Sequence, residues 1–180
     1  LANAQMTLGL ALVHRHTAEE RDRGQRLLTE ISDIFERRGH NLGELPIVNV
    51  YLAREAARRG NPDEAIPLLR AAVDHLFREG RLLVWTVAAT AVLTETLLGR
   101  DADGDVAEAQ ALIERLAAAP AGDGAAMRDI WLLRLRTLLA RATGDAETYA
   151  LLRERYRVTA ESLGFEGHIA WAEVLAETGH

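Results

Sequence analysis

The residues of this chain that could do chemistry are few and restricted in type. All 21 basic residues are arginine, so there is no lysine for a P-loop, a Schiff base or a general base. Cysteine is absent, which excludes a disulfide framework, a thiolate zinc site and a cysteine nucleophile. With these classes removed, we expect a protein that is not an enzyme and that holds no cofactor.

The histidines do not predict a metal site. His14 and His16 are two residues apart, and side chains at that spacing do not face each other on a helix. Asp74 and His75 form an Asp-His dipeptide of the kind found in metal hydrolases. No other predicted helix supplies a matching histidine and acidic residue at the spacing of metal ligands. We therefore expect no bound metal ion, and we expect a structural role for His168 at a helix start.

Arginine is the residue type best suited to binding in this sequence, because its planar guanidinium group matches carboxylate and phosphate. Four arginines fall at positions predicted to line the concave face of a helical array, and the alternative is that they pair with neighbouring Glu and Asp. The candidate binding residues of this groove are Arg54, Arg58, Thr86, Trp131, Arg134, Leu138 and Arg141. The same register predicts exposure for Ile47, Val50, Ala89 and Leu93. Changing Arg134 and Arg141 together to Glu is then expected to weaken the binding of an anionic partner and to change the stability of the fold little.

Three tryptophans lie at or near the starts of predicted helices: Trp85, Trp131 and Trp171. A tryptophan buries a large area, so packing between adjacent hairpins is the expected role. Contact with a ligand in the groove is the alternative.

A helix-turn-helix junction recurs along the chain and would position these side chains. Gly60 can end one helix, Asn61 can cap the next, Pro62 fits its first position, and Glu64 completes a capping box. The same pattern recurs at residues 104–109 and 144–149. The first helical pair lacks it, although Thr17 is a suitable helix start.

Apolar spacing along the chain predicts nine helices and no sheet. Eight of them form antiparallel pairs at about 2–39, 46–79, 82–118 and 127–163, and a capping helix covers about 168–176. The predicted fold is an all-α, right-handed, tetratricopeptide-like solenoid that forms a single domain over residues 1–180.

These junctions resemble those of a tetratricopeptide array, in which small residues such as Ala65 and Ala109 lie at close helix crossings. Residues 156–160 and 163–170 resemble the C-terminal ends of large actinobacterial regulators. Those proteins join a class III nucleotide cyclase or a DNA-binding domain to an AAA-type ATPase and a helical-repeat tail, and an arginine-only, alanine-rich composition fits such a source. The resemblance implies a regulatory scaffold for signal transduction, and it carries over no cyclase or ATPase residue.

Charge and hydropathy narrow the expected partners. The net charge of −6 disfavours direct nucleic-acid binding, and residues 82–98 are too polar to span a membrane. The chain opens on Leu1 without a signal segment, so we expect a cytoplasmic fragment that works with upstream domains of the same polypeptide. The expected partner is a protein or peptide segment, and an acidic one suits the arginines. The alternatives are a structural array that forms a homo-oligomer through residues 1–40 and, more weakly, an all-helical enzyme.

Overall fold

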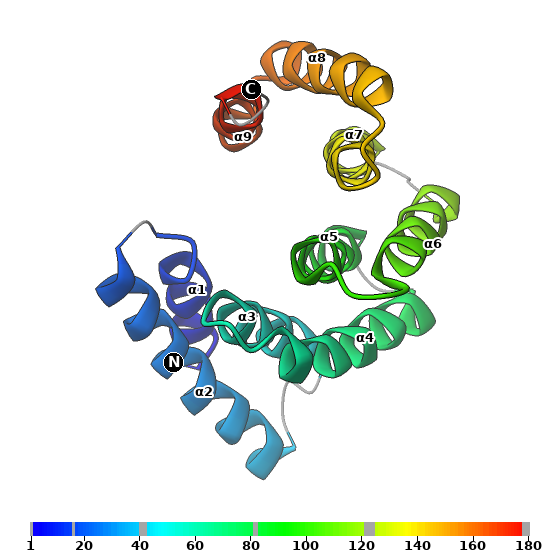
Figure 1. The fold of residues 1–180 in the computed structure, drawn as a ribbon. Coiled ribbons are helices and arrows are strands. Elements are labelled where there is room, and N and C mark those ends of the chain that lie inside the picture. Colours follow the sequence, from blue (N-terminus) through cyan, green and yellow to red (C-terminus); the bar gives the residue numbers. More distant parts are fainter. Residues whose placement is uncertain (1, 16, 40–42, 81–82, 121–124, 178–180) are drawn as a thin grey trace. The chain divides into compact units, whose positions relative to one another are not determined.

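The computed structural model describes residues 2–15, 17–39, 43–80, 83–120 and 125–177 (Figure 1). Within these ranges the chain forms nine α-helices and no strand, which confirms the all-α prediction. The helices are α1 (Ala2–Leu12), α2 (Ala18–Arg38), α3 (Leu45–Arg58), α4 (Pro62–Glu79), α5 (Leu83–Arg100), α6 (Asp105–Ala118), α7 (Ala125–Ala142), α8 (Ala146–Leu163) and α9 (Glu166–Glu177). In this described part of the chain, no helix is long and apolar enough to cross a membrane.

Contacts between helices divide the chain into two compact units, Leu1–Arg81 and Leu82–His180. In the first unit α1 packs on α2 and α3 packs on α4, while α1 and α2 both contact α3. In the second unit α5 packs on α6, α7 packs on α8, and α9 packs on α8, while α5 and α6 both contact α7. The helices therefore pack as sequential pairs, as predicted. A single domain over the whole chain stays a prediction.

The first pair of helices crosses at glycines. Gly9 of α1 and Gly24 of α2 are both buried. A Cβ added at Gly24 would lie 2.8 Å from the backbone nitrogen of Val13 and 2.9 Å from the carbonyl oxygen of Gly9. The two backbones thus approach as closely as their atoms allow. The core beside this crossing consists of Met6, Val13, Leu28, Ile31, Phe35 and Val48.

Two helix starts show which of the predicted caps form. The backbone N–H of Glu20 donates to Thr17 Oγ1 at 3.3 Å, which confirms Thr17 as the cap of α2. At α4, Gly60 has a φ of 91° and Pro62 is the first helical residue, as predicted. Asn61 makes no side-chain cap bond, so the predicted capping box is wrong. The reason is backbone conformation, because Asn61 has a ψ of 54° rather than the extended value typical of a capping residue.

The connection between α5 and α6 differs from the other junctions. Asp101 ends α5 with a φ of 54°, and Gly104, with a φ of 88°, precedes α6. Gly104 is therefore not the structural counterpart of Gly60. Arg100 Nε and Nη2 donate to the two carboxylate oxygens of buried Asp105 at 2.9 and 2.6 Å, and this ion pair stabilises the longer loop.

The core of the second unit gathers around α7, α8 and α9. Gly164 ends α8 with a φ of 66°, and the N–H of Phe165 donates to the carbonyl oxygen of Ala160 at 3.2 Å. Phe165 packs against the core, and such a hydrophobic contact commonly accompanies a helix that ends at a glycine. The buried residues of this core are Ile130, Leu138, Tyr156, Ala160, Ala172 and Leu175.

Candidate functional site

The residues predicted to line a groove fall in both units. Arg54 and Arg58 lie on α3 in the first unit, and Thr86 lies on α5 in the second. The remaining four lie on α7: Trp131, Arg134, Leu138 and Arg141. A single groove lined by all seven residues stays a prediction.

Three of the predicted residues line one pocket. Arg134, Leu138 and Arg141 border a pocket of about 350 Å³ in the second unit, which we call the α5–α7 pocket. Ligand sites commonly have volumes of roughly 300 to 1,000 Å³, so a single side chain or small group would fit. The remaining lining residues are Glu95, Leu98, Gly99 and Ala142.

Arg134 is fixed at this pocket by a carboxylate and by aromatic rings. Its Nε and Nη2 atoms lie 3.1 and 2.9 Å from Glu95 Oε1. Its guanidinium carbon lies 4.6 Å from the centre of the Trp171 ring and 6.0 Å from that of Trp131, distances at which cation–π attraction acts. Only 12% of the side chain is exposed. A glutamate at this position would face Glu95, so the expectation that Arg134 can be changed to Glu with little loss of fold is corrected.

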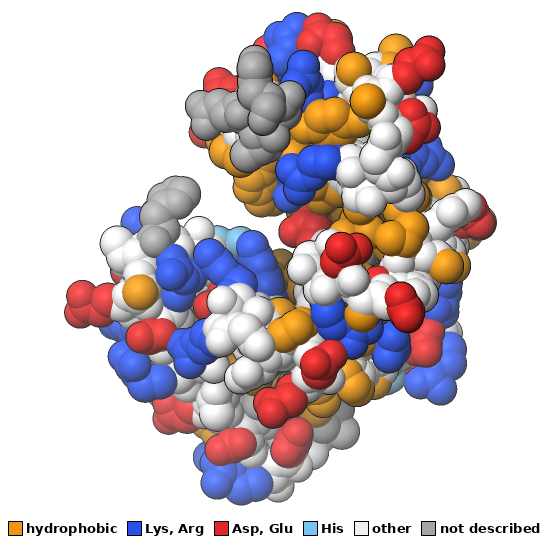
Figure 2. Space-filling view, viewed as in Figure 1, with side chains coloured by type: hydrophobic (Ala, Val, Ile, Leu, Met, Phe, Trp, Pro, Cys, Tyr) orange, Lys and Arg blue, Asp and Glu red, His pale blue; other side chains and the backbone are white. Residues whose placement is uncertain are grey.

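Packed rings form the wall behind Arg134. The His168 ring centre lies 5.0 Å from that of Trp131 and 5.1 Å from that of Trp171, and the two indole rings lie 5.2 Å apart. Figure 2 shows hydrophobic side chains with basic side chains beside them on the surface formed by α7, α8 and α9. The tryptophans of α7 and α9 therefore pack between neighbouring helices, as predicted, and His168 is a buried structural residue.

The titratable groups of this wall are neutral at pH 7. Burial, and to a smaller extent the charge of Arg134, lowers the pKa of His168 to about 4. Burial raises the pKa of Tyr156 to about 12. The Tyr156 hydroxyl lies 2.8 Å from His168 Nδ1, and this hydrogen bond fixes both rings. This pair therefore positions Arg134 and does not provide a proton donor or acceptor that works near neutral pH.

The α5–α7 pocket combines an apolar surface with a positive charge. Leu98 and Leu138 supply the apolar part, and the exposed Arg141 supplies a guanidinium group. The charge of Arg134 is already matched by Glu95. This combination suits a group that carries an apolar side chain next to a carboxylate.

Other predicted groove positions are buried. Thr86 is 5% exposed, so its side chain offers almost no surface to a partner. The predicted exposure is also wrong for Ile47, Val50, Ala89 and Leu93, each at most 1% exposed. The reason is that α3 and α5 each pack against more than one helix, which leaves little of their surface free.

Arg54 and Arg58 differ in their partners. Arg58 Nη1 donates to Glu55 Oε1 at 3.2 Å, as the alternative of neighbouring ion pairs predicted. Arg54 Nη1 instead lies 3.2 Å from Nδ1 of His14, a histidine that our sequence analysis did not connect with binding. No local signal could have shown this contact, because the two residues are 40 positions apart.

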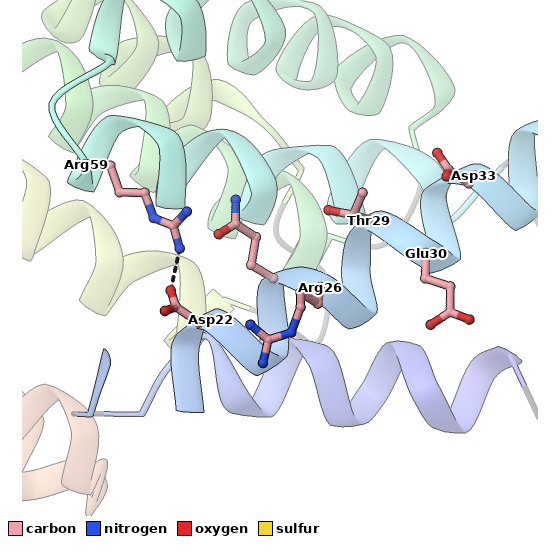
Figure 3. Close-up of a pocket in the computed structure, with 7 residues that line it drawn as sticks. Asp22, Arg26, Thr29, Glu30, Asp33 and Arg59 are labelled. Carbon is pink, nitrogen blue, oxygen red and sulfur yellow. Dashed lines mark hydrogen bonds and ion pairs between the residues drawn. The ribbon is translucent and has the colours of Figure 1, made fainter. Parts of the chain in front are cut away.

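A wider depression of about 740 Å³ runs along α2 in the first unit (Figure 3). Arg59 reaches from the end of α3 to Asp22, and the distance from Nη2 to Oδ1 is 2.5 Å. The other lining residues are Gln25, Arg26, Thr29, Glu30 and Asp33. These side chains are mostly exposed and of mixed charge, with no hydrophobic residue among them, so no class of ligand follows from them.

Comparison of the chain with models of known protein families, with curated proteins and with solved structures found no match. Within the described ranges, no three His, Cys, Asp or Glu side chains come together in a way that could hold a metal ion. The α5–α7 pocket is therefore assigned from its own residues and their geometry.

Proposed function

We propose that this chain is a non-catalytic, tetratricopeptide-like scaffold that binds a protein segment in the α5–α7 pocket. The contacts of the helices support this architecture, because in a solenoid each repeat packs only on its neighbours. Both helices of one pair contact the first helix of the next, at α3 in the first unit and at α7 in the second. Ala65 and Ala109 are completely buried, as small residues at close crossings should be.

The observation that carries the proposed activity is the chemistry of the α5–α7 pocket. Arg141 would bind a carboxylate of the segment, while Leu98 and Leu138 would contact an adjacent apolar side chain. Glu95 and Trp171 hold Arg134 in place and so keep the pocket open. Because Arg141 is exposed and its attraction for a carboxylate is electrostatic, binding of the segment should weaken as salt is added.

The segment bound in this proposal belongs either to upstream domains of the same polypeptide or to another cytoplasmic protein. Its binding would then change the output of those domains. Both the right-handed solenoid and the role in a larger regulator are parts of this proposal and follow from the sequence resemblance.

Gly99 provides a direct test of the pocket. A Cβ at Gly99 would meet no atom within 4 Å, so Gly99→Leu should fill the pocket without disturbing the packing of α5. Ala111→Leu on the exposed surface of α6 adds the same bulk elsewhere and serves as the control. The measurement is binding of a fluorescent peptide of alternating Asp and Leu, together with pull-down of the upstream domains.

We expect Gly99→Leu and Arg141→Glu each to reduce binding at least tenfold, and Ala111→Leu to leave it unchanged. Equal binding by wild type and both pocket variants would contradict the proposal.

A structural array that associates with itself is a second candidate, and one observation favours it. Leu151 and Val158 of α8 are 70% and 49% exposed and lie seven residues apart, on one face of the helix. On α1, the helix of the predicted interface, Leu8 is the exposed large hydrophobic residue among those described, at 43%. Sedimentation velocity of Leu151→Asp and Leu8→Asp distinguishes the two surfaces. A wild type that stays monomeric at high concentration would exclude both.

A further inference from the structure

A second cluster of polar side chains lies in the first unit, where the turn after α1 meets α3. The rings of His14 and Tyr51 are 5.0 Å apart and meet edge to face, at 71°. Arg54 Nη1 lies 3.2 Å from His14 Nδ1. Because arginine is always protonated and has no acceptor, Arg54 is the donor and Nδ1 is the acceptor. His14 is therefore neutral in this arrangement, with its ring proton on Nε2.

Arg58 extends the cluster along α3. It lies four residues after Arg54, on the same face of the helix, and its side chain is 44% exposed. Its Nη1 donates to Glu55, whose side chain is only 4% exposed. The other carboxylate oxygen of Glu55, Oε2, lies 4.0 Å from Nε of Arg21 on α2. Among the described residues, no carboxylate lies within ion-pair distance of Arg54.

The charges of this cluster do not cancel. The cationic side chains are Arg15, Arg21, Arg54 and Arg58, and the anionic ones are Glu20 and Glu55. Arg15 and Glu20 neutralise each other at 3.3 Å, and Arg21 and Arg58 share Glu55. Arg54 has no carboxylate beside it among the described groups, and Arg58 shares its carboxylate with Arg21. Figure 2 shows basic side chains beside a histidine on this part of the first unit.

We propose that His14, Arg54 and Arg58 form a binding site for a phosphate monoester dianion, and that His14 takes up a proton when the anion binds. The proposal concerns the first unit and does not depend on the α5–α7 pocket. Two guanidinium groups on one face of α3, with the imidazole of His14 beside them, match a dianion better than a single carboxylate. Guanidinium groups also bind phosphate oxygens through two parallel hydrogen bonds.

Proton uptake by His14 follows from a change of hydrogen-bond partner by Arg54. When Arg54 turns to the anion, its N–H leaves His14 Nδ1, which becomes free to accept a proton. Burial, followed by the charges of Arg54 and Arg58, holds the pKa of His14 at about 4 in the free protein. A bound dianion offsets both guanidinium charges and attracts an imidazolium ion, so it raises this pKa. The other charged or titratable groups of the cluster are Tyr51 and Glu55 on α3, Arg15 in the turn after α1, and Glu20 and Arg21 on α2.

The binding test uses inorganic phosphate and sulfate, with sodium chloride at equal ionic strength as the reference. Histidine and arginine side-chain signals are followed by NMR in the full chain. We expect saturable shifts of His14 and Arg54 with either dianion. Arg54→Gln and Arg58→Gln should each weaken binding at least tenfold, while Gly99→Leu in the second unit should not change it. Shifts no larger than those with chloride, or unchanged binding in both Gln variants, would overturn the site.

The proton test uses sulfate, which stays a dianion across the pH range. If binding restores the pKa of His14 to its ordinary value near 6.5, sulfate should bind about fourfold more tightly at pH 6 than at pH 8. His14→Gln should remove this dependence and His75→Gln on α4 should keep it. An identical pH dependence in wild type and His14→Gln would overturn proton uptake.

The source of the phosphate group is tested with two further probes. A phosphoserine peptide is compared with the same peptide carrying serine and with inorganic phosphate. Binding of the phosphopeptide at least tenfold more tightly than phosphate would assign the site to a modified protein segment. Equal affinity for the two would assign it to a free phosphate compound. A serine peptide that binds as well as its phosphorylated form would overturn the site.

Discussion

Each of the two units contains an arginine that contacts an aromatic ring and lies beside a histidine, and the two clusters differ in how that arginine is neutralised. Arg134 in the second unit is paired with Glu95 and packed on two tryptophans, and 12% of its side chain is exposed. Arg54 in the first unit contacts Tyr51 and the neutral His14, with no paired carboxylate among the described residues.

This difference teaches that residue type alone does not separate a structural arginine from a binding arginine. A guanidinium that already has a carboxylate and little exposure contributes to the packing of the unit. A guanidinium without a carboxylate can gain one from a ligand, and this is why we assign Arg134 to a wall and Arg54 to a site.

The largest expected effect is a difference in stability between two charge reversals. Arg134→Glu should lower the free energy of unfolding by about 2–4 kcal/mol, since it leaves Glu95 beside a second carboxylate in a partly buried site. Arg54→Glu should change it by less than about 1 kcal/mol, because Arg54 has no paired carboxylate to lose and a glutamate would meet neighbouring arginines. Urea denaturation of both variants measures the difference. Similar losses would show that the two clusters are equally structural.

The pH dependence of unfolding should come mainly from the buried histidine. The pKa of His168 is about 4 in the folded chain and near 6.5 when unfolded, so the unfolded state binds the proton first as the pH falls. Stability should therefore be constant above about pH 7 and fall by up to about 3 kcal/mol between pH 6.5 and 4. His168→Gln should remove most of this decrease in denaturation curves, and the remainder should come from the more exposed His14, whose pKa is also about 4. A decrease of unchanged size in His168→Gln would place its cause elsewhere.

Replacing a glycine by alanine should change stability in opposite directions in the two units. Gly24→Ala should destabilise the first unit by about 1–3 kcal/mol, since the new Cβ would overlap the backbone of α1. Gly99→Ala should stabilise α5 by about 0.5–1 kcal/mol, because the site is open and alanine favours a helix. Thermal unfolding of the two variants gives the comparison. A stabilising Gly24→Ala would mean that the first pair crosses at a greater distance.

The smallest expected effect is on the histidine of the first unit. Arg54→Gln should raise the pKa of His14 above about 4 but not to its ordinary value, because burial is the larger cause of the shift. An NMR titration of the ring protons measures it, with Arg59→Gln as a control on the same helix end. No change in the pKa would remove Arg54 from this cluster.

Much of the fold could be predicted from sequence because helices are specified locally. The predicted start at Pro62 and the predicted end of the pair at about residue 79 agree with α4, and Thr17 caps α2 as expected. Local rules failed where the backbone conformation depended on its surroundings. Asn61 does not cap α4 through its side chain, and the loop before α6 is longer because Arg100 and Asp105 stabilise it.

Part of the candidate site was also local. Arg134, Leu138 and Arg141 share one face of α7 at helical spacing, so their meeting in one pocket follows from that spacing and the predicted register. Glu95 and Trp171, which hold Arg134, and His14, which contacts Arg54, were not predicted because they lie on other elements.

The amino-acid sequence by itself determined that the chain is helical, where most helices end, and that arginine is its only cationic side chain, because these properties depend on residue type and on near neighbours. Only the tertiary structure decided which arginines are neutralised. The charge of a guanidinium is matched by groups that are close in space, and Arg134 and Glu95 are 39 positions apart in the sequence. Their packing made one arginine part of the wall of a pocket, while Arg54 was left beside a neutral histidine.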